Sequence, residues 1–150
     1  MLDDDMKAII VQSNLGFAAT VNVDGSPNLS PKVTIRPYDD YHLIFANLAS
    51  PGTIENLRRD PRIEVNCIDV FSRRGYRFTG SATVHSPGDA LYEDFKQTMK
   101  QEMGPDTKVR DAVLIKLDEV KPILSPAYAN KGVTEEGLRK TYLRRYGVTV

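Results

Sequence analysis

The sequence predicts a mainly β protein (α+β), an antiparallel barrel of about six strands with four helices at its margins. Two observations predict this class. Short segments in which apolar and polar residues alternate recur along the chain, as strands with one buried face require. Hairpin turns or one short helix join most of these segments, which indicates antiparallel rather than parallel pairing.

The bulk composition favours one ordinary globular domain of 150 residues. We expect the barrel over about residues 15–120 and a C-terminal extension with a helix over residues 121–150. The 20 basic and 20 acidic residues cancel, so net charge predicts neither a nucleic-acid nor a membrane partner. The acidic start and the lack of a long apolar run predict a cytoplasmic protein. The single cysteine excludes an internal disulfide and a cysteine-rich metal site.

The N-terminal third is predicted to form a helix over residues 3–13 and then a hairpin. Asp24-Gly25 is the strongest hairpin signal in the chain, between strands at residues 17–23 and 28–36. In the return strand the residues of one face are Leu29, Pro31, Val33 and Ile35, and those of the other are Ser30, Lys32, Thr34 and Arg36. Pro31 predicts an edge strand or a bulge. The polar face is either half solvated or part of a site.

A buried strand is predicted at residues 42–46, and a helix follows at residues 52–59. Ser50 is well placed as the N-cap and Pro51 as the first helical residue. Such a start presents unpaired backbone N–H groups and the positive end of the helix dipole. Ser50 therefore either only caps the helix or, with Thr53, contributes to an anion site.

The strands at residues 63–67 and 76–85 are joined by a loop that ends in Arg73 and Arg74. This pair is either a solvated turn or a fork for a phosphate or carboxylate. A helix at residues 89–103, a strand at 112–117 and a basic helix capped by Thr134 complete the chain. We expect the last helix to form a surface or a subunit contact.

The chain lacks the motifs of hydrolytic or nucleotide-hydrolysing enzymes. There is no G-x-S-x-G, no Walker loop and no G-x-G-x-x-G, and the two histidines lie far apart on separate predicted strands. What the chain offers instead is a set of hydrogen-bond donors: Ser30, Lys32, Ser50, Thr53, Arg73 and Arg74. Donors of this kind suit an anionic cofactor that brings its own reactivity.

Three segments carry a family resemblance: FAATVNVDGSPNLSPK, FANLASPGTIENLRRDPRIEVN and FSRRGYRFTGSA. In order and spacing they resemble the pyridoxamine 5′-phosphate oxidase-like, FMN-binding split-barrel family, over roughly residues 4–120. The resemblance implies a six-stranded split β-barrel and a homodimer with FMN at its interface. It implies a cofactor-binding set of Ser30, Pro31, Lys32, Ala46, Asn47, Ser50, Gly52, Thr53, Arg73 and Arg74. The residues themselves show no spacing typical of a metal site, and no catalytic residue is assigned.

In that family the strand that matches Ser30-Pro31-Lys32 runs along the flavin ring, and the turn that matches residues 47–53 holds the ribityl chain and phosphate. The resemblance thus places Lys32 beside the ring edge, where its charge would stabilise reduced flavin. Family members often carry lysine or arginine where this chain has Gly52. A true pyridoxamine 5′-phosphate oxidase is not expected, because residues 123–150 contain no histidine for the family's arginine–histidine substrate motif.

The leading expectation is an FMN-dependent oxidoreductase that takes hydride from NAD(P)H or a small reductant and passes it to an unknown small substrate. Two alternatives stay open. One is a flavin-binding or flavin-carrying protein without turnover. The other is a relative of the same fold that binds deazaflavin F420 or haem.

Overall fold

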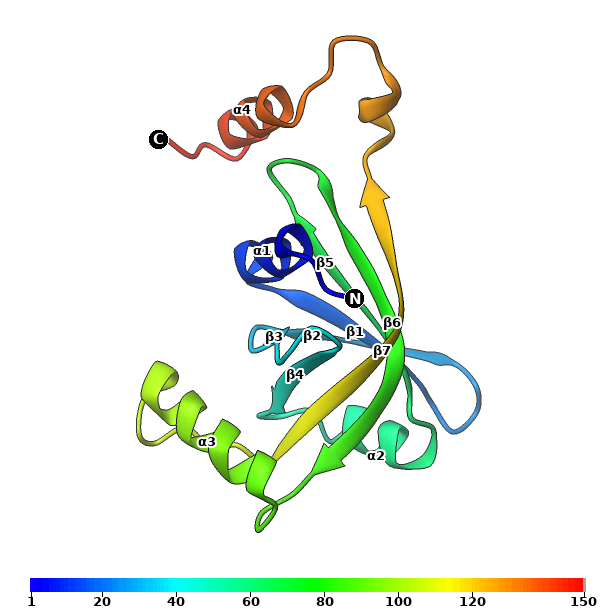
Figure 1. Cartoon of the computed structure of the whole chain (residues 1–150), viewed down its shortest axis with the longest axis vertical. Helices are drawn as coiled ribbons and strands as arrows, with labels where there is room; N and C mark the ends of the chain where they lie inside the picture. The colour runs from blue at the N-terminus through cyan, green and yellow to red at the C-terminus, as the bar shows by residue number, and fades with distance from the viewer. Residues whose placement is uncertain (150) are drawn as a thin grey trace.

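The computed structural model describes residues 1–149, and within them the chain forms one curled antiparallel sheet with helices around it (Figure 1). The strands are β1 Gly16–Val21, β2 Pro27–Lys32, β3 Arg36–Pro37, β4 His42–Asn47, β5 Arg62–Asp69, β6 Arg74–His85 and β7 Asp111–Leu124. The helices are α1 Asp4–Ser13, α2 Pro51–Arg59, α3 Ala90–Met103, the 3-10 helix η1 Pro126–Ala129 and α4 Glu135–Arg145. The predicted mainly β, antiparallel class is confirmed.

The strand order is β2-β1-β5-β6-β7-β4-β3, so β2 and β3 form the two edges of the sheet. The sheet has seven strands rather than the expected six, because the predicted strand at residues 28–36 divides. The chain bends after Lys32, and the Thr34 hydroxyl accepts a hydrogen bond from the backbone N–H of Ala46 in β4, at 2.9 Å. This short crossing links the two sheet edges and curls the sheet into a half-barrel.

The first hairpin forms where the sequence predicts it. Gly25 has φ +84°, a conformation that favours glycine, and the Asp24 carboxylate accepts from the backbone N–H of Ser26 at 2.9 Å. The expectation that Pro31 marks an edge strand is also confirmed, since within residues 1–149 β2 pairs only with β1.

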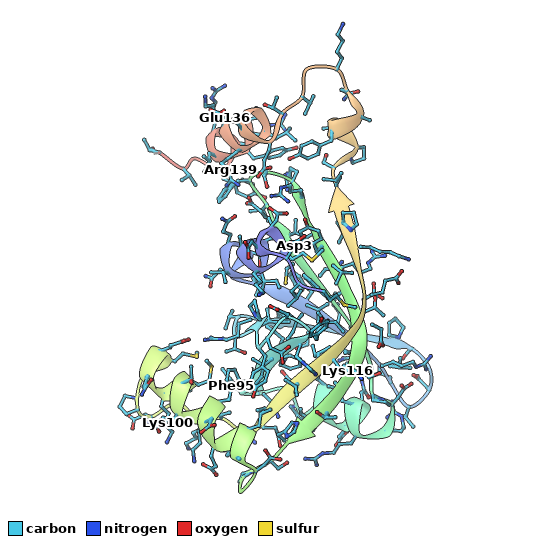
Figure 2. All side chains as sticks on the ribbon, viewed as in Figure 1. Asp3, Phe95, Lys100, Lys116, Glu136 and Arg139 are labelled. Atoms are coloured by element: carbon cyan, nitrogen blue, oxygen red, sulfur yellow. The ribbon has the colours of Figure 1, made fainter. Side chains whose placement is uncertain are left out.

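The main core lies inside the curl, under α1, and a second cluster lies between α3 and strands β4 and β7. Cys67 belongs to the first cluster and is fully buried, where it packs as a small apolar side chain. Phe95 points from α3 toward the sheet, whereas Lys100 lies on the outer part of that helix (Figure 2). Helices α1 and α3 both bury their apolar faces against the sheet, and this packing fixes β4 and the start of α2 in place.

The C-terminal helix α4 packs over the turn between β5 and β6, at the end of the sheet opposite α2 (Figure 1). It has no buried residue, and polar contacts attach it. Arg139, on the side of α4 that faces the turn (Figure 2), donates to the buried carboxylate of Asp69. Within residues 1–149 no helix is long and apolar enough to cross a lipid bilayer.

Candidate functional site

The inner face of β2 carries polar side chains into the curl of the sheet. Lys32 is only 5% exposed, whereas Leu29 on the opposite face is 66% exposed. The alternation predicted for this strand is correct, but the polar face is the buried one, so the half-solvated interpretation is wrong for Lys32. Burying a lysine ammonium is costly unless a partner compensates for its lost hydration.

The start of α2 lies directly across from this face. Ser50 is the N-cap, but its hydroxyl makes no capping bond to the helix. Pro51 has no N–H, and within residues 1–149 the backbone N–H groups of Gly52 and Thr53 have no protein acceptor. The helix therefore offers amide donors and the positive end of its dipole at this point.

Three side-chain contacts join β2 to the α2 start. The Lys32 ammonium donates to the Ser50 hydroxyl, and the hydroxyls of Ser30 and Ser50 lie 3.4 Å apart. The Asn28 amide donates to the Thr53 hydroxyl at 3.4 Å. We call these five residues the donor cluster. The structure thus brings together Ser30, Lys32, Ser50 and Thr53, which the sequence had proposed from separate segments.

The donor cluster is electrically positive and uncompensated. No carboxylate in residues 1–149 lies within ion-pair distance of Lys32, and burial lowers the pKa of its ammonium below the ordinary 10.5. The ammonium also lies 5.5 Å from the centre of the Phe45 ring. A buried positive charge next to a helix N-terminus creates an environment that favours a bound anion.

A second layer of contacts holds the loop that leads into α2. The Asn47 side-chain oxygen accepts from the backbone N–H of Ser50 at 2.8 Å, and its amide donates to Asp111 at 2.9 Å. Asp111 in turn accepts from the Ser86 hydroxyl at 3.1 Å. Both Asn47 and Asp111 are nearly fully buried, so this chain of hydrogen bonds fixes where Ser50 stands.

The other proposed cofactor residues fall into different places. Gly52 faces open space, since a Cβ built there would meet nothing within 4 Å. Pro31 points to the outer face of β2. Ala46 is buried against α3 and provides only its backbone N–H to Thr34.

The structure does not bring Arg73 and Arg74 to the donor cluster within one chain. Both lie at the turn under α4, away from α2 (Figure 1). Arg74 is held by Asp5 at 2.7 Å and Glu135 at 3.0 Å, and its guanidinium lowers the pKa of Asp5 to about 2. Arg73, with φ +58°, stacks on the Tyr142 ring at 3.7 Å. These contacts anchor the C-terminal helix.

Two members of the site were missed from the sequence. Asn28 lies two residues before Ser30 on the same face of the strand, so the period of two was a usable signal. Asp111 had no such signal, because its contact with Asn47 depends on the pairing of β4 with β7.

Comparison with known proteins identifies a family that the sequence matches and solved structures with the same fold. Residues 2–123 match the family described as Pyridoxamine 5′-phosphate oxidase. The structure of HupZ from Group A Streptococcus is 30% identical and has a TM-score of 0.75, covering 83% of this chain and 96% of that one. An FMN-binding protein from Syntrophomonas wolfei subsp. wolfei shares the fold at 12% identity and a TM-score of 0.68, covering 81% and 86%. The uncharacterized protein MJ0282 of Methanocaldococcus jannaschii is 24% identical over 131 residues, 84% of each chain.

Proposed function

The chain belongs to the pyridoxamine 5′-phosphate oxidase family, and from this premise we propose that it is an FMN-dependent oxidoreductase that acts on a small molecule. The observation that carries the proposal is the buried Lys32 ammonium, which has no carboxylate partner in residues 1–149 and touches the N-cap of α2. A phosphate group would complete this arrangement, because it accepts hydrogen bonds from several donors at once.

The residues of the donor cluster fit the anionic end of FMN. Ser30, Ser50 and Thr53 supply hydroxyl groups, and Lys32 supplies a positive charge. The amides of Gly52 and Thr53 are aligned by the helix, and no Cβ at Gly52 obstructs access to them. When bound, the flavin would supply the hydride chemistry, while these residues would bind and orient it.

The contacts within the donor cluster involve neither a carboxylate nor an imidazole. This favours a chain that contributes binding and electrostatics rather than a general base. The same observation supports a second candidate function, a flavin carrier without turnover. Reduction of the bound flavin by a nicotinamide distinguishes the two.

We also propose a homodimer with the flavin at the interface between two copies. On the outer face of β1 and β2, Phe17 is 40% exposed and Leu29 is 66% exposed. Leu29 lies on the same strand as Lys32, but its side chain is on the opposite face. A groove of about 460 Å³ in this face is lined by Phe17, Ala19, Leu29, Glu64, Asn66 and Ile68. A second copy docked on this face would cover its apolar surface and lie next to the site.

The test is the visible spectrum of the protein after FMN is added and unbound flavin is removed by desalting. We expect retained flavin absorbance that bleaches under anaerobic NADH or NADPH. Retained absorbance that no nicotinamide bleaches would favour the carrier. A protein that retains no flavin would contradict the proposal.

A further arm of this test uses pyridoxamine 5′-phosphate as substrate with bound FMN. We expect no pyridoxal 5′-phosphate, because residues 123–150 hold no histidine for the family's substrate motif. Appreciable product would identify the chain as the oxidase itself.

A further inference from the structure

A hydroxyl, an imidazole and a carboxylate are hydrogen-bonded in series where β6 leads into α3, outside the donor cluster. The Thr83 hydroxyl lies 2.8 Å from Nε2 of His85, and Nδ1 of the same ring lies 3.0 Å from a carboxylate oxygen of Asp89. Thr83 and His85 share one face of β6, and Asp89 begins α3. This is the order of nucleophile, base and orienting carboxylate in hydrolytic triads, which geometry identifies even where no sequence motif does.

Asp89 determines which ring nitrogen of His85 carries the proton. It is the N-cap of α3, and its second oxygen accepts from the backbone N–H of Leu91 at 2.9 Å. The hydrogen bond from His85 lowers the pKa of Asp89, so this carboxylate is ionised at neutral pH. An ionised carboxylate can only accept, so the neutral ring carries its proton on Nδ1 and accepts from Thr83 at Nε2. A general base needs this tautomer.

Space for an apolar substrate lies next to the triad. A groove of about 490 Å³ crosses the outer face of the sheet from β1 to β7, and Ser81 of β6 lines one end of it. Thr83 is two residues further along the same face, a distance of about 7 Å. This end of the groove lies two strands away from β1, where the second copy is proposed to dock.

A positive charge is also available on this face. Lys116 of β7 (Figure 2) pairs with Ser81, so it is the diagonal neighbour of Thr83. Long side chains reach diagonal neighbours across a sheet. The Lys116 ammonium would stabilise the negative charge that develops on a carbonyl oxygen when Thr83 attacks.

We propose that Thr83, His85 and Asp89 form a second, hydrolytic site that cleaves small apolar carboxylic esters. The Thr83 oxygen forms a bond to the carbonyl carbon, and the bond from that carbon to the alcohol oxygen breaks. His85 takes the hydroxyl proton at Nε2 and gives it to the departing alcohol. Water then attacks the acyl-threonine, His85 transfers its proton back to Thr83, and the carboxylic acid is released. Asp89 is a positioning residue.

The chain contains a matched control in His42. Its Nδ1 lies 2.8 Å from Asp39, and its side chain is 28% exposed against 21% for His85. Within residues 1–149 no hydroxyl is hydrogen-bonded to Nε2 of His42. A surface imidazole alone would cleave esters at both histidines, whereas acyl transfer through a hydroxyl is expected at His85 alone.

The experiment measures kcat and KM of the full chain for p-nitrophenyl acetate. We expect faster cleavage than with free imidazole at the same concentration. Thr83→Val and His85→Gln should each lower kcat by about 100-fold or more, the usual effect of general-base catalysis. Thr83→Ser should retain the activity, and His42→Gln should leave it unchanged. Acid quenching followed by peptide mass spectrometry should locate an acetyl group on Thr83.

Asp89→Asn tests the positioning role. Asparagine is an equally good N-cap, so Tm and KM should stay unchanged, but it does not fix the ring tautomer, so kcat should fall. A loss of Tm without a loss of kcat would contradict this role.

Three results would overturn the inference: equal rates for the wild type and Thr83→Val, a wild type no faster than free imidazole, and acetyl groups confined to lysines or the N-terminus. None of these measurements requires bound flavin. A failure of the hydrolytic site is therefore distinguishable from a failure of the proposed function.

Discussion

A lysine buried without a carboxylate partner raises the free energy of the folded state, because its ammonium loses hydration that the chain does not replace. Lys32 is in this position, with one hydroxyl partner at Ser50 and the face of the Phe45 ring nearby. Residues of this kind are typical of binding sites, where a ligand supplies the missing interaction. At the residue scale, the ligand-free protein is thus less stable with lysine at position 32 than it would be with an apolar residue there.

We predict that Lys32→Met raises the stability of the flavin-free protein at neutral pH by about 1 kcal/mol, or about 3 °C in Tm. The stability difference between Lys32→Met and the wild type should become smaller at alkaline pH. The pKa of Lys32 in the folded state lies below its ordinary 10.5, so between these two values the folded state binds fewer protons than the unfolded state. Wild-type stability therefore rises with pH across this window.

Thermal unfolding of both proteins at several pH values between 7 and about 10.5 measures this difference, the upper limit being close to the unperturbed lysine pKa. A Lys32→Met protein that is less stable than the wild type at neutral pH would show that the ammonium is compensated within the protein.

At the scale of the element, the start of α2 is the part of the donor cluster that we propose holds the anionic end of the ligand. Besides the hydroxyls of Ser50 and Thr53, it offers backbone N–H groups whose direction is set by the helix rather than by a flexible side chain. The loop before it is held by Asn47 through the backbone N–H of Ser50, so the first turn is fixed before any ligand arrives. A preorganised site of this kind reduces the entropy cost of binding.

Substitution of Gly52 is predicted to separate helix stability from ligand binding. Gly52→Asp places a carboxylate in open space in the first turn, where the dipole favours it by about 0.3–1 kcal/mol, so the protein should become more stable. The same carboxylate repels a phosphate, and FMN affinity should fall by about tenfold or more.

Gly52→Asn is the matched control for this substitution, because it has the same shape and no charge. It should keep FMN affinity within about threefold of the wild type, a change of less than 1 kcal/mol. Titration of FMN against both variants, with thermal unfolding in parallel, measures the two effects. If aspartate and asparagine weaken FMN equally, the phosphate does not lie at the α2 start.

At the scale of the whole molecule, the curl of the sheet makes one face of β2 internal and leaves the other uncovered. The inner face carries the β2 members of the donor cluster, and the outer face presents Leu29 to solvent, in the same groove as Phe17 of β1. Exposed apolar side chains on an edge strand favour association, and an isologous dimer would cover the same face of both copies.

We predict that Leu29→Glu converts a dimer into a monomer and also weakens FMN binding, because the charge would be buried without a partner in the interface. Val23→Glu is the control. Val23 is 84% exposed but lies in the turn of the first hairpin, beyond the paired strands. Sedimentation velocity should show dimers for the wild type and Val23→Glu, and a wild type that sediments as a monomer would refute the homodimer.

Much of the fold could be predicted from short-range patterns. Asp24-Gly25 predicted the first hairpin, alternation predicted which residues of β2 share a face, and Ser50-Pro51 predicted where α2 begins. Each of these depends on neighbours within a few positions, where backbone conformational preference and side-chain period are decisive. The donor set Ser30, Lys32, Ser50 and Thr53 was accessible in the same way.

Which residues each donor contacts depends on the tertiary structure. Strands β2 and β4 lie far apart in the order of the sheet, and only its curl brings Lys32 to Ser50 and turns the polar face of β2 inward. Asp111 reaches Asn47 across 64 positions of sequence. Arg74 looked like another phosphate ligand, but Asp5 and Glu135 hold it at the far end of the sheet.

The sequence by itself thus determined the local elements and which faces of them carry the hydrogen-bond donors. The tertiary structure alone decided which donors form one site. The physical reason is that periodicity and capping act within a few residues, whereas burial and charge pairing depend on every segment that packs against a side chain.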